Sequence, residues 1–579
     1  MRRTLAWRFF AVTALLAVLG TGVVVQIIRI QNSPEVEGII GQGDYIWRTF
    51  YPARGEIYER NGHLLAGNKT VYEVGVDLTG EPKPDFPTIA LAAQITLGLD
   101  PGEMLSLMMN AAPTTQYVVL ADYVPADKAQ ALMDLQELSA DDPNGLTLDA
   151  VGFKAHLMRS YPEDDLAATV LGFVTRDNHG YLGVEEKYDS VLAGMPVSLL
   201  IPADPRRALE YPHIPAGQTL VLTLDRELQS AVEDILDEAL DDTGASSGTI
   251  VVMDPRNGEI LAMASTPRLN LNNYTQIDEL FPGATPYNRA ISQAYEPGSV
   301  VKILTMAAAL DANTIRPDTT FFDTGVIVYG GWPIYNWDRG AWGTQDMTGC
   351  LAHSLNVCLA WVSTTMGNDP FYMYMQRFGL GHPTGIDLAG EVPGRLKLPG
   401  DDDWYAVDLA TNAFGQGVAI TPIQLMMAAS SIANQGQMVY PHVLLAQVQD
   451  GRQRNLSMQI VGTPITAATA RMLSEMLANG LEGESSEALV EGYRIAGKTG
   501  TAQIPEVGGY DERDINASFI GWGPVDDPQF MVYVWLEKPQ TNRAASVVAA
   551  PIFRQVVEKT IVLLGIPPDA IRLQIATGQ

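Results

Sequence analysis

The chain opens with a long uncharged run of apolar residues. Residues 9–28 carry no charged side chain, and three arginines precede them. Twenty residues at about 1.5 Å each match the roughly 30 Å hydrocarbon core of a bilayer. We predict a membrane anchor at 9–28, with residues 1–8 in the cytoplasm and the remainder outside, because basic residues favour the cytoplasmic side. A cleaved signal peptide is the alternative, but the run is long for one and no clear cleavage site follows it.

After a linker at residues 29–50, the pattern becomes mixed. Residues 51–212 combine a β-like stretch at 72–76 with helical stretches at 88–97 and 126–138, and many prolines interrupt them. This pattern predicts an α+β region with extended connections rather than a compact enzyme core.

From residue 213 the pattern changes to that of a packed domain. A strand is expected at 219–225, and apolar side chains at helical spacing predict a helix at 226–240. Two hairpins are expected, the first pairing 249–254 with 259–263 and the second pairing 517–522 with 529–535, before a helix at 549–563. Strands joined by tight turns predict an antiparallel sheet.

Composition narrows the class of protein. The 579 residues are too many for one core, and 46% hydrophobic with 18% charged residues is typical of a globular chain. The net charge is −30, from 37 basic and 67 acidic side chains. This balance argues against nucleic acid as a partner, because phosphate binding requires clustered Lys and Arg.

The two cysteines leave a question open. Cys350 and Cys358 are eight residues apart, about 12 Å along one helix and too far to bond. A bridge is possible if Cys350 lies outside a helix. We favour two small buried cysteines without a bridge.

The strongest candidate for chemistry is a serine followed by a lysine. Ser299 and Lys302 are separated by three positions at the start of an apolar, alanine-rich run, so a helix would place them on one face. A lysine whose pKa is lowered by burial and a second cation could take the serine's proton. Alone, the pattern equally fits a helix-capping serine beside a solvated lysine.

Two further motifs follow in order. Ser354 could relay a proton and Asn356 could bind a substrate amide, although a polar helix face is the better explanation for that motif taken alone. The run Lys498, Thr499, Gly500 and Thr501 lies in a predicted strand, where the glycine would let a substrate backbone approach. Lys498 supplies the second positive charge.

A competing nucleophile motif is rejected. Gly244, Ser246 and Gly248 match a G-x-S-x-G elbow, but a helical stretch precedes them and a strand follows, the reverse of the order an elbow needs. We identify no metal site, no phosphate-binding glycine loop and no required cofactor.

The order S-x-x-K, S-x-N, K-T-G resembles that of penicillin-binding proteins and serine β-lactamases. Residues 213–565 resemble the transpeptidase domain of class B penicillin-binding proteins, through the segments 254–263, 288–290, 384–387, 414–424 and 517–521. Residues 54–66 resemble that family's N-terminal R-G-x-I-x-D-R-N-G-x-x-L-A, with Glu59 in place of Asp, and residues 183–189 resemble its G-I-E-x-x-Y-D.

The resemblance implies an α+β, multi-domain protein with a β-lactamase/transpeptidase-like fold. Its catalytic domain, residues 213–565, would hold an antiparallel five-stranded sheet flanked by helices. An elongated pedestal or dimerisation domain at 51–212 and the single anchor would precede it, and residues 566–579 would form a tail.

The resemblance also implies a mechanism. Ser299 would attack the carbonyl between two terminal D-alanines of a peptidoglycan stem peptide, with Lys302 as the base. Ser354 and Lys498 would pass a proton to the departing D-Ala. The N–H groups of Ser299 and Thr501 would form the oxyanion hole, while Lys498, Thr499 and Thr501 would hold the donor's carboxylate.

The implied partners are a D-Ala-D-Ala donor, an amine acceptor, β-lactams as inhibitors and a membrane-embedded lipid II polymerase of the SEDS type, in division or elongation. A carboxypeptidase or β-lactamase is the enzymatic alternative, but it predicts a compact single domain. A non-enzymatic scaffold or β-lactam sensor is the third possibility, and the intact motifs argue against it.

Overall fold

The computed structural model describes residues 13–14, 16–26, 29, 45–80, 83–140, 147–202, 214–282, 285–484, 486–506, 509–542 and 544–577. The chain divides into two compact units. The first comprises Met1–Ala53 and Ala193–Gly217, and the second comprises Arg54–Leu192 and Gln218–Gln579. Most of the predicted pedestal therefore shares a unit with the predicted catalytic domain, and the boundary at 212/213 stays a prediction.

The first unit contains one strand pair. β1 (Tyr45–Phe50) and β8 (Val197–Pro202) run antiparallel over six residue pairs. The predicted anchor at 9–28 lies partly outside the described residues. Among the residues that the structure describes, no helix is long and apolar enough to cross a membrane.

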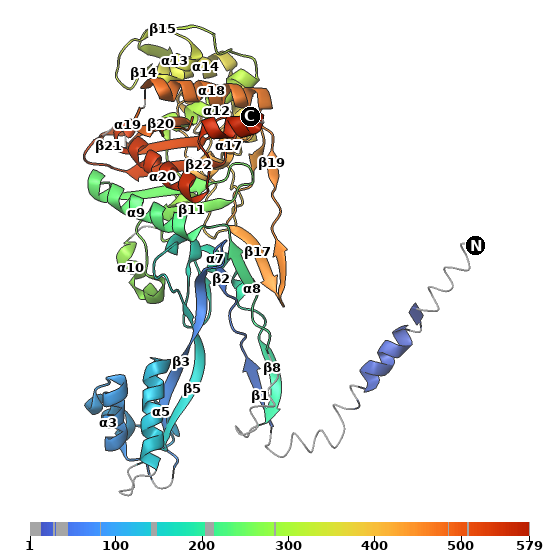
Figure 1. The fold of residues 1–579 in the computed structure, drawn as a ribbon, viewed down its shortest axis with the longest axis vertical. Helices are drawn as coiled ribbons and strands as arrows, with labels where there is room; N and C mark the ends of the chain where they lie inside the picture. The colour runs from blue at the N-terminus through green and yellow to red at the C-terminus, as the bar shows by residue number, and fades with distance from the viewer. Residues whose placement is uncertain are drawn as a thin grey trace. The chain divides into compact units, whose positions relative to one another are not determined.

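A five-stranded antiparallel sheet organises the second unit, in the order β11-β10-β22-β21-β20. Its strands are β10 (Ser247–Met253), β11 (Ile260–Ser265), β20 (Ala496–Glu506), β21 (Gly509–Gly523) and β22 (Phe530–Glu537). Both predicted hairpins are confirmed. Strands more than 200 residues apart in the sequence lie side by side, which Figure 1 shows as green strands beside red ones.

Both faces of this sheet are buried. Along β22, Val532 and Val534 face one apolar cluster, whereas Met531 and Tyr533 face another. Successive side chains of a strand point to opposite faces, so a strand covered on both sides must be apolar throughout. This explains why residues 250–253 of β10 and 530–536 of β22 are continuous hydrophobic runs instead of alternating ones.

Helices cover the two faces. α9 (Arg226–Thr243) and α20 (Ala550–Leu563) pack together on one face, and both were predicted from the sequence. On the other face, the helices that contact the sheet include α11 (Arg289–Ser292), η3 (Gly298–Val301), α17 (Pro422–Ala433) and α18 (Ala467–Glu484). The same apolar cluster also contains residues of α12 (Lys302–Asp311), α13 (Met347–Ala352), α14 (Asn356–Met366), α15 (Asn368–Arg377) and α16 (Ala406–Asn412).

The predicted pedestal is built around long strands. β3 (Leu64–Asp77) pairs with β4 (Tyr117–Pro125) and β5 (Val151–Ser160), and the predicted helices appear as α3 (Phe86–Leu97) and α5 (Ala126–Ala140), with α4 (Pro101–Met109) beside α3. The same sheet continues through β2 (Ile57–Tyr58) to β9 (Thr219–Leu222), β17 (Leu444–Gln449) and β18 (Arg452–Asn455). This sheet thus connects the strands of the predicted pedestal, through β2, to strands of the predicted catalytic domain.

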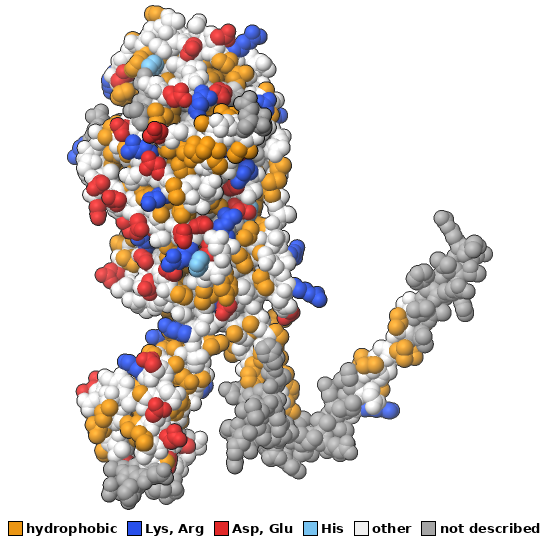
Figure 2. All heavy atoms as spheres, viewed as in Figure 1, with side chains coloured by type: hydrophobic (Ala, Val, Ile, Leu, Met, Phe, Trp, Pro, Cys, Tyr) orange, Lys and Arg blue, Asp and Glu red, His pale blue; other side chains and the backbone are white. Residues whose placement is uncertain are grey.

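Shorter elements complete the second unit. They are β6 (Phe173–Val174), β7 (Gly180–Tyr181), β12 (Phe321–Asp323), β13 (Val326–Tyr329), β14 (Trp332–Tyr335), β15 (Gly343–Gln345), β16 (Met438–Val439), β19 (Ile460–Gly462), α6 (Ala168–Leu171), α7 (Gly183–Lys187), α8 (Asp189–Leu192), η2 (Leu271–Gln276), α10 (Ile277–Leu280), η4 (Ser486–Ala488), α19 (Ala545–Val548) and α21 (Asp569–Thr577). On the face of this unit that Figure 2 shows, acidic and basic side chains are interspersed rather than gathered into a basic stripe.

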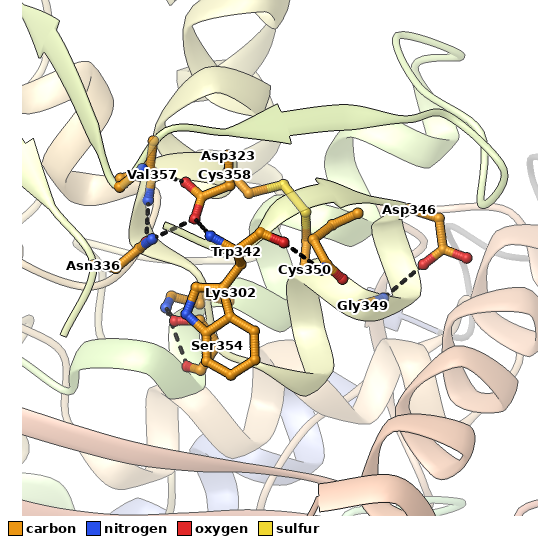
Figure 3. Close-up of a disulfide and its surroundings, with 12 residues drawn as sticks. Lys302, Asp323, Asn336, Trp342, Asp346, Gly349, Cys350, Ser354, Val357 and Cys358 are labelled. Atoms are coloured by element: carbon orange, nitrogen blue, oxygen red, sulfur yellow. Dashed lines mark hydrogen bonds between the residues drawn. A yellow bond between two sulfur atoms is a disulfide. The ribbon is translucent and has the colours of Figure 1, made fainter. Parts of the chain in front are cut away.

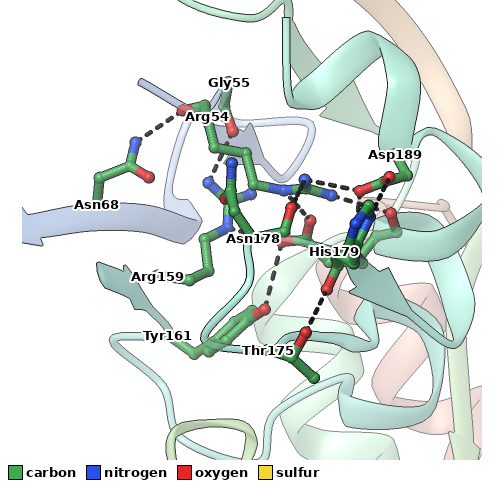
Figure 4. Close-up of polar contacts among 11 residues, drawn as sticks. Arg54, Gly55, Asn68, Arg159, Tyr161, Thr175, Asn178, His179 and Asp189 are labelled. Carbon is green, nitrogen blue, oxygen red and sulfur yellow. Dashed lines mark hydrogen bonds and ion pairs between the residues drawn. The ribbon is translucent and has the colours of Figure 1, made fainter. Parts of the chain in front are cut away.

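A buried ionic cluster in the second unit joins the segment that begins at Arg54 to helix α7 and strand β5 (Figure 4). Glu185 accepts from Arg54 Nε and from Arg159 Nε, each at 2.7 Å, and Arg54 also contacts Asp189 at 2.8 Å. The side chains of Arg54, Glu185 and Arg159 are 1%, 0% and 3% exposed. Two of the family-like segments, 54–66 and 183–189, are therefore joined by one carboxylate.

We expect Glu185→Ala to lower the free energy of unfolding by about 3–5 kcal/mol, because it leaves two buried guanidinium groups without their shared counter-ion. Urea unfolding followed by tryptophan fluorescence measures the loss. Glu558→Ala, which removes a weak surface ion pair on α20, is the control and should change stability by less than about 0.5 kcal/mol. Equal losses in the two variants would contradict a structural role for the cluster.

Candidate active site

Ser299 lies in a tight turn that runs directly into a helix. It belongs to η3, and α12 begins at Lys302, whose backbone N–H bonds to the Ser299 carbonyl. The sequence predicted a helix opening at this serine, and its first turn is the tighter 3-10 form. Gly298 has φ +63°, and a Cβ there would lie 2.9 Å from the Ala502 side chain. Glycine is therefore required for the turn to approach strand β20 this closely.

The amine of Lys302 is buried and surrounded by acceptors. Its side chain is among the largest that are fully buried. Nζ donates to the Ser354 carbonyl at 2.6 Å, to Ser354 Oγ at 3.1 Å and to Asn356 Oδ1 at 2.8 Å. The first two sequence motifs, which are about fifty residues apart, thus meet at one nitrogen.

Ser354 occupies the turn between α13 and α14, with φ +55°, a conformation that serine rarely adopts. The turn brings the end of α13 close to the start of α14, and a disulfide joins Cys350 to Cys358 across it with a Cα–Cα distance of 6.1 Å. Our expectation of unbridged cysteines is wrong. Each cysteine lies in a helix, but the helices differ, so the separation along one helix does not apply.

Strand β20 brings the third motif to the same place. Lys498 is 5% exposed, and β20 forms one edge of the five-stranded sheet. A Cβ on Gly500 would lie 2.9 Å from Val300 Cγ1 and 3.0 Å from the Pro297 carbonyl, so the strand packs directly against the serine turn. An edge strand also offers N–H and C=O groups with which an extended peptide can pair.

Two threonine hydroxyl groups of β20, those of Thr499 and Thr501, make contacts near the third motif. Lys498 Nζ lies 3.3 Å from the Thr499 carbonyl and 3.4 Å from its hydroxyl. Thr501 is exposed, and its hydroxyl accepts from the Ala545 N–H at 3.2 Å, at the start of α19.

Burial sets the protonation of the two lysines. Desolvation lowers the pKa of Lys302 well below its ordinary value, and the positive charge of Lys498 lowers that pKa further. Burial also lowers the pKa of Lys498 to about 8. A lysine with a strongly depressed pKa can be neutral near pH 7, as a general base must be.

All predicted site residues gather in one region of the second unit. Hydrogen bonds join Lys302 to Ser354 and Asn356, and packing brings η3, with Ser299, against the β20 segment from Lys498 to Thr501. The arrangement can offer a hydroxyl, a buried amine and a second lysine to one substrate carbonyl. The individual roles of these residues stay predictions.

Sequence reasoning missed the residues that support this turn. Asn336 accepts from the Val357 N–H at 3.1 Å and donates to Asp323 at 2.7 Å (Figure 3). Asn356 Nδ2 donates to the Tyr335 carbonyl at 3.1 Å. Asn336, Asp323 and Tyr335 belong to no recognisable motif, because their effect depends on contacts with α14 that form only in the fold.

Comparison with known proteins identifies the class. Residues 248–558 match the family described as "Penicillin binding protein transpeptidase domain", and residues 49–196 match "Penicillin-binding Protein dimerisation domain". Stage V sporulation protein D of Bacillus subtilis is 32% identical over 541 residues, covering 90% of this chain and 79% of that protein. Peptidoglycan D,D-transpeptidase FtsI of Escherichia coli is 29% identical, covering 90% of this chain and 85% of that protein.

A solved structure has a similar fold. Penicillin binding protein 3 of Mycobacterium tuberculosis, complexed with aztreonam, has a TM-score of 0.68 and 26% identity, covering 90% of this chain and 98% of that one. The chain therefore belongs to the penicillin-binding protein family, with a transpeptidase domain and an N-terminal dimerisation domain. The resemblance to the class B members that the sequence indicated is confirmed.

Proposed function

We propose that Ser299 is the acylated residue of this peptidoglycan D,D-transpeptidase. The observation that carries the proposal is the position of Lys302, fully buried beside the serine turn with three acceptors from the Ser354–Asn356 turn around its amine. A neutral amine has two N–H donors, so it keeps two of these acceptors and directs its lone pair at Ser299. It takes the proton of Ser299 as the hydroxyl oxygen attacks the penultimate D-Ala carbonyl.

Other groups of the site act in the first half-reaction, which forms the ester on Ser299 and releases D-Ala. Backbone N–H groups of Ser299 and Thr501 stabilise the oxyanion, and one such donor contributes about 3 kcal/mol. Ser354 and Lys498 deliver a proton to the nitrogen of the departing D-Ala. Lys498, Thr499 and Thr501 hold the donor's carboxylate, and Gly500 lets its backbone approach β20.

The second half-reaction completes the cross-link. Asn356 holds an amide of the donor while an amine of a neighbouring stem peptide attacks the ester carbonyl. The new amide forms as the bond to Ser299 Oγ breaks, and the serine regains its proton. A β-lactam would stop the cycle at the ester.

We further propose that residues 9–28 anchor the chain in the cell membrane, with residues 1–8 in the cytoplasm and the catalytic domain outside, in a chain that serves division or elongation. The uncharged run preceded by arginines supports this. The Cys350–Cys358 disulfide also supports it, because disulfides persist in oxidising compartments. The predicted pedestal, 51–212, would dock a lipid II polymerase of the SEDS type.

A fluorescent penicillin tests the acylation chemistry. Mass spectrometry of the digested, labelled protein should place the adduct on the peptide that carries Ser299, and the label should persist for many minutes. Loss of the label within seconds would instead indicate a β-lactamase, and an adduct on another peptide would refute the assignment of Ser299.

A further inference from the structure

We propose that the Cys350–Cys358 disulfide is a positioning element of the active site, which holds the turn carrying Ser354 and Asn356 against Lys302. The inference rests on the proposed roles of these residues. It adds a residue pair outside the three sequence motifs to the parts that set the acylation rate.

The bond closes a small ring around the turn. Cys350 lies in α13 and Cys358 in α14, and the sulfurs are joined while both side chains are fully buried. Within the ring, the Leu355 N–H bonds to the Cys350 carbonyl at 3.0 Å. Figure 3 shows the disulfide on the same turn as Ser354, with Lys302 beside it.

Every acceptor recorded for the Lys302 amine comes from inside this ring. The Ser354 carbonyl, the Ser354 hydroxyl and Asn356 Oδ1 all belong to the segment between the two cysteines. A shift of this segment therefore moves the proposed proton relay and the amide-binding group together, relative to the buried base.

The turn needs such a restraint. Ser354 has φ +55°, in the left-handed region that a residue with a Cβ enters only when its surroundings impose it. The disulfide fixes the two helix ends that flank this residue, and so limits relaxation to an ordinary conformation.

A second set of contacts, made by Asn336, supports the start of α14 in addition to the disulfide. Asn336 accepts from the Val357 N–H, and its amide donates to Asp323, whose carboxylate also accepts from the Trp342 N–H at 2.9 Å. These contacts hold the start of α14 from the opposite side. Loss of the disulfide should therefore loosen the turn without unfolding the domain.

The expected consequence is kinetic. A displacement of about 1 Å can cost 10²-fold in rate, so breaking the bond should slow acylation by about tenfold to 100-fold. The noncovalent affinity for a β-lactam should fall by less than the acylation rate constant does, because the residues proposed to hold its carboxylate lie on β20, outside the ring, and only the amide contact of Asn356 moves with the turn.

The test uses the full-length protein and the variant Cys350→Ala/Cys358→Ala. The rate of acylation by a chromogenic cephalosporin, followed over a range of concentrations, separates the acylation rate constant from the dissociation constant. Wild-type protein is also reduced with a phosphine in water, which supplies the oxygen of the resulting phosphine oxide and the two protons of the thiols. It is then re-oxidised with oxidised glutathione, which is reduced to two molecules of glutathione.

Support requires a slower acylation rate constant in the variant and in reduced wild type, a smaller change in the dissociation constant than in that rate constant, and recovery on re-oxidation in wild type alone. Thermal melting must show both proteins folded at the assay temperature. The proposal is overturned if the acylation rate constant is unchanged or if only the dissociation constant rises. It is also overturned if a smaller fraction of the protein becomes labelled while the acylation rate constant stays the same. If the variant fails to fold, reduced wild type decides by the same criteria. Absence of acylation in untreated wild type would refute the proposed function instead.

Discussion

Replacing Ser299 by alanine is expected to abolish covalent labelling by a fluorescent penicillin, with a rate loss of about 10⁶-fold by comparison with other enzymes that lose a nucleophilic serine. The reason is chemical, because alanine has no atom that can form the ester. The side chain is only half-buried, so the free energy of unfolding should change by about 1 kcal/mol or less. Gel fluorescence after incubation with the penicillin measures the labelling, and thermal melting checks the fold.

The chain supplies a matched control for this variant. Ser246 lies in the rejected G-x-S-x-G motif, where it is exposed and donates to the Glu537 carbonyl at 3.1 Å. Ser246→Ala should label like wild type. If Ser299→Ala retained labelling while Ser246→Ala lost it, the nucleophile would be the residue that the order of secondary structure had excluded.

Replacing Lys302 by methionine is expected to slow acylation by about 10²- to 10⁴-fold, the usual contribution of a general base. Burial and the charge of Lys498 lower the pKa of Lys302, which favours the neutral amine that its proposed role as the base requires. Methionine fills a similar volume without a basic atom. The second-order rate constant for acylation by a chromogenic cephalosporin measures the effect.

Lys559→Met provides the comparison, because Lys559 is an exposed lysine on α20. Its acylation rate should match that of wild type. If Lys302→Met acylated normally and Lys498→Met did not, the base would be the lysine of β20. Lys302 would then be a structural residue that donates hydrogen bonds to the acceptors of the Ser354–Asn356 turn.

Much of the fold could be predicted because its determinants are local. The hairpin that pairs β10 with β11 follows from two apolar runs around a turn, and α9 follows from apolar side chains at helical spacing. The bounds differ from those predicted by only a few residues.

The sequence could predict which residues form the site, but not how they are held in place. The motifs around Ser299, Ser354 and Lys498 named the reactive groups. The bridge between Cys350 and Cys358 was not foreseen, because the helix break at Ser354 is imposed by tertiary contacts. Asn336 was missed for a related reason, since its function depends on a contact with α14 and leaves no local pattern.

By itself, the sequence determined which groups are available for chemistry and which segments form strands and helices, because periodicity and motif spacing are properties of neighbouring residues. Only the tertiary structure decided that Lys302 is buried among acceptors from a turn about fifty residues away and that the segment around Gly500 packs against the serine turn. Burial and close approach depend on the packing of distant segments, and these determine the pKa of an amine and the reach of a hydroxyl.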